Sequence, residues 1–175
     1  MEVTEKTVHT LYLTFRLEDE IFALEVEHLR EVLDMCPITK IPRAESYMRG
    51  VINVRGSVVP VMDLRTKLGL PSVEPTINTR IIILEIPFEG KKTIMGAIAD
   101  SVEDVLEIDS DHINEAPDLG SQKHQSIMKG IGKNNNNFMI ILDLDKLLRK
   151  HTSNVQPPVV DSYNQSLVGE NISYA

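Results

Sequence analysis

The sequence predicts a mainly β protein built from two small closed barrels, and three observations lead to this fold class. Short apolar runs, several of them alternating with polar residues, recur at close spacing between turn residues. Few stretches have the length and periodicity of a long helix. One pattern of strand, turn, strand and short helix occurs twice. Small closed barrels suit such a chain because closure hides the edges of the strands.

The first predicted strands lie near the N-terminus. Residues 11–17 alternate between the two faces of a strand, with apolar side chains on one of them. An acidic turn at residues 18–20 leads into a second apolar strand at residues 21–24.

The most informative stretch is residues 47–69, which predicts a strand, a tight turn, a second strand and a short helix. The turn places Arg55 at the end of a rigid hairpin. Pro60 cannot donate to a ladder, so the second strand is expected to be an edge strand at that point. Asp63 can cap the helix by accepting backbone N–H bonds, and Gly69 can end it in the left-handed conformation.

The second half of the chain continues the series of short strands. Residues 80–86 are apolar almost throughout, which predicts a more fully buried strand. A turn at residues 88–92 leads into a further strand at residues 93–99. Residues 133–137 predict a polar loop, and residues 138–142 predict a late strand.

An internal duplication is indicated by two segments that lie 80 positions apart. Met48-Arg-Gly-Val aligns with Met128-Lys-Gly-Ile, and the turn, the apolar run and the Asp-Leu helix start then keep their spacing. The alternative is coincidence between similar apolar strands. The period is too long for a solenoid repeat, and it suits two small β modules related by a pseudo-twofold axis.

The expected domain organisation follows from this duplication. Residues 1–154 are expected to form one domain of two barrel subdomains, roughly residues 18–70 and 80–150, with strand exchange between them possible. Modules of this size have marginal cores, so the two should pack tightly. Residues 155–175 contain Pro157-Pro158 and many Ser and Asn residues, which indicates a flexible C-terminal tail.

Composition excludes several classes of function. The chain has 175 residues, a formal net charge of −8 and a pI near 5.1, which argues against general nucleic-acid binding and docking on anionic lipid. Its single cysteine, Cys36, favours a reducing cytosol. Neither a secretory signal nor a membrane-spanning apolar run is visible. We therefore expect a cytoplasmic protein.

Signatures of catalysis and of ligand binding are weak. The five histidines are scattered along the sequence, and neither a phosphate loop nor a nucleophile elbow is present, so we expect no metal, cofactor or catalytic site. The acidic run from Asp100 to Asp118 contains no Lys or Arg. It is interpreted as a solvated face, and the alternative is a surface that meets a basic partner or repels wrong ones. A small barrel hydrolase that uses these carboxylates is a distant alternative.

Several motifs together resemble the CheW family of bacterial chemotaxis coupling proteins, and the likeness covers roughly residues 11–149. They are Leu29-Arg-Glu-Val-Leu33, Ile41-Pro42, Tyr47-Met-Arg-Gly-Val-Ile52, Asn53-Val-Arg-Gly56, Val58-Val-Pro-Val-Met-Asp-Leu-Arg65, Gly96-Ala-Ile-Ala-Asp-Ser-Val-Glu-Asp-Val105 and Asp143-Leu-Asp-Lys-Leu-Leu148.

The resemblance implies two five-stranded, SH3-like barrels side by side and a non-enzymatic adaptor without a cofactor. The adaptor would couple chemoreceptors to the histidine kinase CheA. One partner would be the tip of the receptor's cytoplasmic helical hairpin, received in a hydrophobic groove, and the other the regulatory domain of CheA. The protein would reach the membrane receptor arrays only through these partners. A CheW-like protein of another chemosensory pathway, serving surface motility or adhesion, is the alternative.

The resemblance also implies partner-binding residues at Leu29, Glu31, Gly50, Val54 and Arg55. Arg55 matches the signature arginine and is expected to bond a receptor acid or carbonyl, with an ordinary exposed arginine as the alternative. For Gly50, a backbone position that tolerates no Cβ is the alternative to direct contact. For Leu29, core burial is the alternative.

Overall fold

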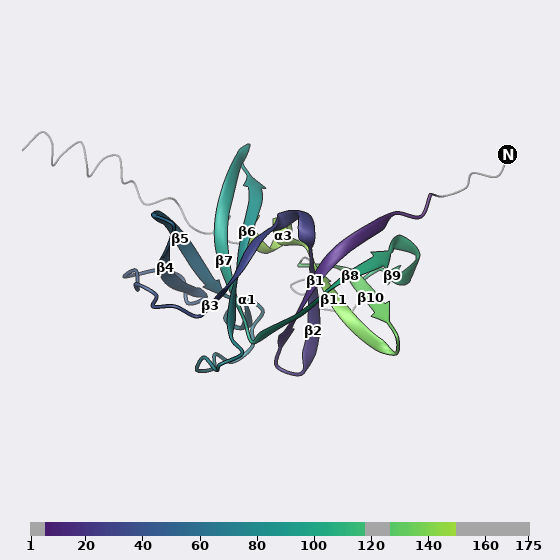
Figure 1. The fold of residues 1–175 in the computed structure, drawn as a ribbon, viewed down its shortest axis with the longest axis horizontal. Coiled ribbons are helices and arrows are strands. Elements are labelled where there is room, and N and C mark those ends of the chain that lie inside the picture. Colours follow the sequence, from purple (N-terminus) through teal and green to yellow (C-terminus); the bar gives the residue numbers. More distant parts are fainter. Residues whose placement is uncertain (1–5, 118–126, 150–175) are drawn as a thin grey trace, which may run out of the picture.

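The computed structural model describes residues 6–117 and 127–149, which form two β-sheets lying side by side (Figure 1). The strands are β1 (His9–Leu17), β2 (Glu20–Glu25), β3 (Leu29–Asp34), β4 (Met48–Val54), β5 (Ser57–Asp63), β6 (Arg80–Phe88), β7 (Lys91–Ala99), β8 (Ser101–Asp109), β9 (Ile113–Asn114), β10 (Met128–Asn134) and β11 (Asn137–Leu142). The helical elements are η1 (Val26–His28), α1 (Leu64–Lys67), η2 (Ser110–His112) and α3 (Leu144–Arg149).

The predicted mainly β fold is confirmed. One sheet has five strands in the order β3-β6-β7-β5-β4, and the other has six in the order β8-β1-β2-β11-β10-β9. The sixth strand, β9, has two residues and adds to the expected five. With their helical elements, we call the five-stranded sheet the β3–β7 barrel and the six-stranded sheet, which also contains β1 and β2, the β8–β11 barrel.

Each sheet closes because its two outermost strands are consecutive in the chain. In the β8–β11 barrel, β8 runs through η2 into β9, which pairs with β10. In the β3–β7 barrel, the chain beyond β3 reaches Thr39, whose backbone exchanges two 2.9 Å hydrogen bonds with Val51 of β4. Ile131, 80 positions after Val51, makes the matching pair with Asn114 of β9. Closure therefore follows one plan in both barrels.

The two barrels exchange their hairpins. The N-terminal hairpin β1–β2 pairs with β8 and β11, whereas the later hairpin β6–β7 pairs with β3 and β5. The parallel pairing of Val61 with Gly96 in one barrel corresponds to that of Ile141 with Ala23 in the other. This correspondence supports a duplication with strand exchange, while the subdomain boundaries at residues 18–70 and 80–150 stay a prediction.

The structure corrects the predicted polar loop at residues 133–137. Strands β10 and β11 extend into the asparagine run, leaving Asn135 and Asn136 as the turn. Asn135 has a φ of +50°, a left-handed conformation that asparagine tolerates better than most residues. The turn is therefore as tight as the one at Arg55.

Two further corrections concern strands. No strand was predicted at β3 or β8, because acidic side chains interrupt their apolar pattern. The strand that contains Pro60 is internal to its sheet, since β5 lies between β4 and β7. The pairing of β5 with β7 begins only at Val61, so the missing N–H of Pro60 leaves no hydrogen bond to β7 unmade.

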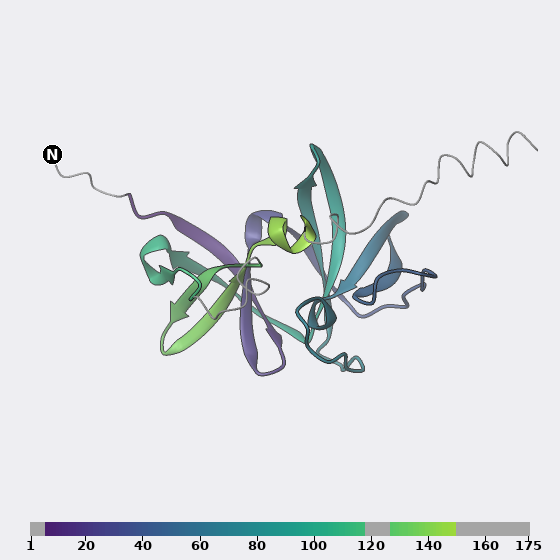
Figure 2. The same cartoon turned by 180° about the vertical axis from the view of Figure 1, so that it is seen from behind.

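Three apolar clusters form the core. One lies in each barrel, built around Met139 and Ile141 in the β8–β11 barrel and around Val61 and Ile81 in the β3–β7 barrel. The third and largest joins the barrels. It takes side chains from both hairpins and from helix α3, which lies near the junction of the two lobes when the molecule is seen from behind (Figure 2). The two small barrels thus share one central core, which supports the expectation that they pack tightly.

The expected flexible tail at residues 155–175 lies outside the described residues. Among the residues that are described, none of the helices combines the length and the apolar character needed to cross a bilayer.

Candidate functional site

The turn between β4 and β5 holds Arg55 away from the barrel. Arg55 has a φ of +50° and Gly56 a φ of +86°, and the turn is tied by a 2.7 Å hydrogen bond from the Gly56 N–H to Oδ1 of Asn53. The Arg55 side chain is 80% exposed. A rigid turn therefore presents a cation at the end of the hairpin, as predicted.

Arg55 has a partner within the chain that the sequence did not reveal. Its Nη1 lies 3.0 Å from Oε1 of Glu31 and its Nη2 lies 2.8 Å from Oε2, which is a bidentate pair. Glu31 is on β3 and Arg55 follows β4, the two outermost strands of this sheet. The pair therefore spans the seam of the β3–β7 barrel. Arg55 was expected to bond an acid or carbonyl of the receptor, and here its guanidinium already holds Glu31.

Gly50 is constrained by its own backbone. It has a φ of +140°, and a Cβ built on it would lie 2.0 Å from the carbonyl oxygen of Thr39. This close approach belongs to the Thr39–Val51 bridge that closes the barrel. The structural alternative for Gly50 therefore has direct support, and a role in partner contact stays a prediction.

Leu29 and Val54 are both half-buried. Leu29 packs against the central core, and Val54 packs against the core of the β3–β7 barrel. The structure thus brings Glu31 and Arg55 into contact, with Val54 next to Arg55 in the chain. Leu29 lies at the start of β3 with much of its side chain in the core. Direct partner contact by either residue stays a prediction.

An apolar groove of about 260 Å³ runs along the junction of the two barrels, and the sequence did not locate it. One side comes from the segment that follows α1, and the other comes from strands of the β8–β11 barrel. Its lining comprises Leu17, Glu18, Glu20, Phe22, Leu68, Leu70, Ile127, Met128, Ile140 and Leu142. Acidic side chains occur only among the lining residues from the β1–β2 turn and the start of β2. The groove is chemically suited to an apolar helical surface.

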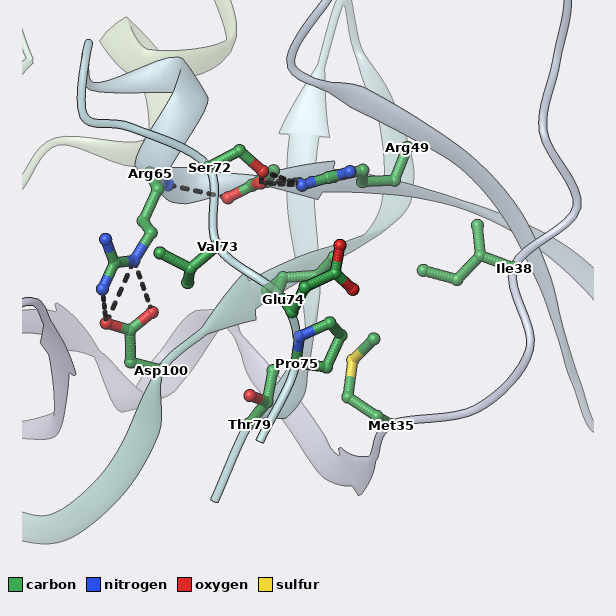
Figure 3. A pocket seen from close by; sticks show the side chains of 12 residues that line it. Met35, Ile38, Arg49, Arg65, Ser72, Val73, Glu74, Pro75, Thr79 and Asp100 are labelled. Carbon is green, nitrogen blue, oxygen red and sulfur yellow. Dashed lines mark hydrogen bonds and ion pairs between the residues drawn. The ribbon is translucent and has the colours of Figure 1, made fainter. Parts of the chain in front are cut away.

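A more polar pocket of about 380 Å³ lies beneath the loop that leads from α1 to β6 (Figure 3). Arg49 bonds the buried carboxylate of Asp63 at 2.7 Å, and Ser72 of the loop contacts both of them. Asp63 also accepts a 3.0 Å bond from the Arg65 N–H, so it caps α1 as predicted. These contacts fix the loop over the barrel, and the charges of the Arg49–Asp63 pair are already matched.

The second ion pair of this pocket joins Arg65 to Asp100 (Figure 3). Arg65 Nε lies 2.8 Å from Oδ1 of Asp100, and Nη1 lies 3.3 Å from Oε1 of Glu18. Burial alone would raise the pKa of Asp100, but hydrogen bonds from Arg65 and from the Glu18 N–H lower that pKa below its ordinary value. Asp100 therefore departs from the predicted solvated acidic face, because it is part of an internal network.

Surface histidines form groups that the sequence spacing did not show. His9 lies beside Glu107 and Asp109 across β1 and β8, and His28 lies near Glu25 and Glu27. Their ligand atoms are close enough to hold a cation. Both groups lie on or near the surface, where such clusters are common without a bound ion.

Comparison with known proteins decides the family. The family model described as a CheW-like domain matches residues 11–152, which include both barrels and the groove between them. The chain belongs to the CheW-like family. The resemblance carried by the sequence motifs is therefore confirmed.

Individual relatives agree with this assignment. The chain is 33% identical over 147 residues to the chemotaxis protein CheW of Bacillus subtilis, covering 83% of this chain and 91% of the relative. It is 30% identical over 135 residues to the chemotaxis protein CheW of Rhizobium meliloti, covering 77% and 84%. The crystal structure of the scaffolding protein TtCheW from Thermoanaerobacter tengcongensis matches with a TM-score of 0.71 at 30% identity, covering 84% of this chain and 92% of that one.

Membership of the CheW-like family also settles the class of function. Proteins of this family are non-catalytic scaffolds, so the expectation of an adaptor rather than an enzyme is confirmed.

Proposed function

We propose that this chain couples chemoreceptors to the histidine kinase CheA in bacterial chemotaxis. The observation that carries the proposal is the match to the CheW-like domain over residues 11–152, together with the structural likeness to a scaffolding CheW protein. A scaffold of this kind needs at least two surfaces, one for each partner. The structure offers surfaces of two different kinds, a concave apolar groove and convex hairpin turns.

The groove is suited to the receptor. A helical hairpin presents an apolar stripe, and such a stripe docks well in a hydrophobic groove. Leu68 and Leu70 from one barrel and Ile127 and Ile140 from the other line this groove. Because the lining comes from both barrels, a helix bound there would contact both. Its position would then depend on how the barrels are arranged.

The hairpin turns are suited to the kinase. Val58, three residues after Arg55, and Phe138, at the corresponding place in the second barrel, are both large exposed apolar side chains. Each barrel thus offers one such residue beside a tight turn. A regulatory domain of CheA with the same double-barrel fold could meet these ends in a head-to-tail contact, which can close into rings. The Arg55–Glu31 pair lies beside the first of these turns, where it would form the polar part of a contact with the receptor or with the kinase.

The proposed location follows from the partners. The protein would be cytoplasmic and would be held at membrane receptor arrays through its contacts with the receptor and the kinase. A change in the receptor hairpin would favour one packing of the scaffold and kinase over another.

A calorimetric titration of the full chain with the regulatory domain of CheA from the same organism tests the kinase half of the proposal. We expect saturable one-to-one binding. Ile77→Glu, which introduces a charge at an exposed position outside the two hairpin turns, serves as the control and should bind like the wild type. Absence of heat and of a shifted sedimentation boundary, with both proteins shown to be folded, would refute kinase binding.

A second candidate is a coupling protein of another chemosensory-type pathway. A 71-residue stretch is 31% identical to the protein PilI of Pseudomonas aeruginosa, covering 41% of this chain and 40% of that one. This match is much shorter than those to the CheW proteins. Isolation of the receptors and kinase that co-purify with the tagged protein from its own cells would separate the two candidates.

A further inference from the structure

Arg65 lies at the junction of the two barrels. It belongs to helix α1 of the β3–β7 barrel, and its side chain is 12% exposed. Its partner Asp100 is the single residue between β7 of that barrel and β8 of the other. Its second partner, Glu18, lies in the turn between β1 and β2 of the β8–β11 barrel. One guanidinium therefore contacts both barrels and the crossing between them.

Asp100 makes hydrogen bonds through both its carboxylate and its backbone N–H. The Asp100 carboxylate accepts bonds from Arg65 and a 2.8 Å bond from the Glu18 N–H, and the Asp100 N–H donates to the carbonyl oxygen of Arg16 at 3.0 Å. Arg65 Nη1 also donates to the carbonyl oxygen of Pro71 at 3.2 Å. The planar fork of arginine suits this arrangement, because it holds several acceptors in fixed directions at once.

The same residues border the apolar groove. Glu18 belongs both to the network and to the groove lining, and Leu17 precedes it on the same side. On the other side, the N–H of Leu70 donates to the carbonyl oxygen of Arg65 at 2.7 Å, which fixes the groove-lining Leu70 to the residue that makes the pair. The separation of Glu18 and Leu70 across the groove is therefore tied to the Arg65 network.

We propose that Arg65 is a positioning residue that sets the opening between the two barrels and thereby the affinity of the groove for a helical hairpin. The second part of this inference rests on the proposed function, whereas the first part concerns the chain alone. Arg65 would act without touching the hairpin, by holding Asp100 and Glu18 against α1. Removal of its guanidinium leaves the barrels joined by the central apolar core but lets the groove change width.

Distances between spin labels test the first part. In a Cys36→Ala background, Ser57→Cys and Asn137→Cys place one label beside each hairpin turn, at exposed positions 80 residues apart in the sequence that correspond between the barrels. Double electron–electron resonance then reports the separation of the barrels in the full chain. We expect Arg65→Met to broaden or shift the distance distribution and Arg65→Lys to do so less, because lysine keeps the charge without the fork.

A control variant separates the loss of an arginine ion pair in general from the loss of the pair at the junction. Arg16 pairs with Glu103 between β1 and β8, which are neighbours inside one barrel. Arg16→Met therefore removes an arginine ion pair that does not cross the junction. It should leave the distance distribution unchanged.

Binding of a chemoreceptor cytoplasmic hairpin fragment tests the second part in the same variants. We expect Arg65→Met to weaken binding by about tenfold, which corresponds to about 1.4 kcal/mol, and Arg16→Met to leave it unchanged. If Arg65→Met does not fold, Glu18→Gln, which alters only the contact at Nη1, replaces it and should still broaden the distribution.

The outcomes separate this inference from the proposed function. An unchanged distance distribution in Arg65→Met overturns the positioning role, and where Arg65→Met does not fold, an unchanged distribution in Glu18→Gln does so. A changed distribution with unchanged hairpin affinity overturns the link to the groove. If the hairpin fails to bind even the wild type while Arg65→Met still changes the distribution, the positioning role stands and the receptor half of the proposed function fails.

Discussion

Arg55 and Glu31 pair across the seam of the β3–β7 barrel, with Nη2 of the arginine 2.8 Å from Oε2 of the glutamate. Their strands, β3 and β4, are the two outermost strands of the sheet and do not pair with each other. The ion pair therefore links the two edges of the sheet, in addition to the bridge between Val51 and Thr39, which follows β3 in the chain. The arginine is nevertheless mostly exposed. Arg55 can therefore hold the Glu31 carboxylate in position for a partner while adding little to the stability of the barrel.

We expect Arg55→Ala to weaken coupling to partners while it lowers the free energy of unfolding by less than about 1 kcal/mol, because exposed ion pairs contribute little. Urea denaturation measures the stability, and calorimetric titrations with a chemoreceptor hairpin fragment and with CheA measure the coupling. The exchanged pair Glu31→Arg with Arg55→Glu is the control. It should restore the ion pair but not partner binding if Arg55 contacts the partner directly. A large loss of stability in Arg55→Ala would show that the residue is structural.

Gly50→Ala should destabilise the fold strongly, by about 3 kcal/mol or more, since it combines backbone strain with a clash against the Thr39 carbonyl. Gly56→Ala is the matched control. Gly56 also has a positive φ, but a Cβ there meets nothing within 4 Å, so the cost should be about 1 kcal/mol. Thermal and urea unfolding measure both variants. Equal costs would show that the clash is relieved by a small shift of the segment around Thr39.

Leu70→Glu should reduce the affinity for the receptor hairpin by about tenfold or more, because it places a charge in the apolar groove. Ile77→Glu is the control, since Ile77 is 89% exposed on the loop outside the groove lining. Leu70→Glu should melt somewhat below the wild type because Leu70 packs against the central core, but both variants should stay folded at the assay temperature and retain CheA binding. Equal loss of hairpin affinity in the two variants would argue against the groove as the receptor site.

Asp100 should make the stability of the protein depend on pH. Its folded-state pKa lies below its ordinary value of 3.8, so its ionised pair with Arg65 stabilises the fold above about pH 4. That contribution is lost as the pH falls through the lower, folded-state pKa. The difference in free energy of unfolding between the wild type and Asp100→Asn should therefore be largest near neutral pH and shrink below about pH 4.

Urea denaturation between pH 7 and about pH 2.5 measures this difference across the range in which carboxylates titrate. Asp104→Asn, at an exposed position on the neighbouring strand β8, is the control and should show a small difference throughout. A difference for Asp100→Asn that stays constant down to the lowest pH would show that the ionised carboxylate is not the origin of the stabilisation.

Local patterns predicted much of the secondary structure. The strands around residues 11–17, 80–86 and 93–99 follow from their apolar residues, and the cap at Asp63 follows from its position before a helical run. Strands β3 and β8 were missed because their burial is partial and acidic residues such as Glu103 and Asp104 face solvent along them. Partial burial weakens the two-residue period on which strand prediction depends.

Contacts between residues far apart in the chain could not be predicted from the sequence. Glu31 and Arg55 were both predicted as site residues, but their mutual contact depends on closure of the barrel. Arg65 and Asp100 are 35 positions apart, and nothing in their local sequence links them. The offset of 80 residues between the two copies was a usable signal for the paired barrels. The groove could not be predicted, because it depends on how the two barrels are arranged in space.

Reconstitution of receptor-controlled kinase activity tests coupling most directly. Membranes that contain a chemoreceptor and purified CheA from the same organism are assayed for CheA autophosphorylation with and without this protein. We expect activity to rise when the protein is added, and to fall again when the receptor binds its attractant. Kinase activity that stays the same with and without the folded protein, in an assay that an established CheW protein activates, would contradict the proposed coupling function.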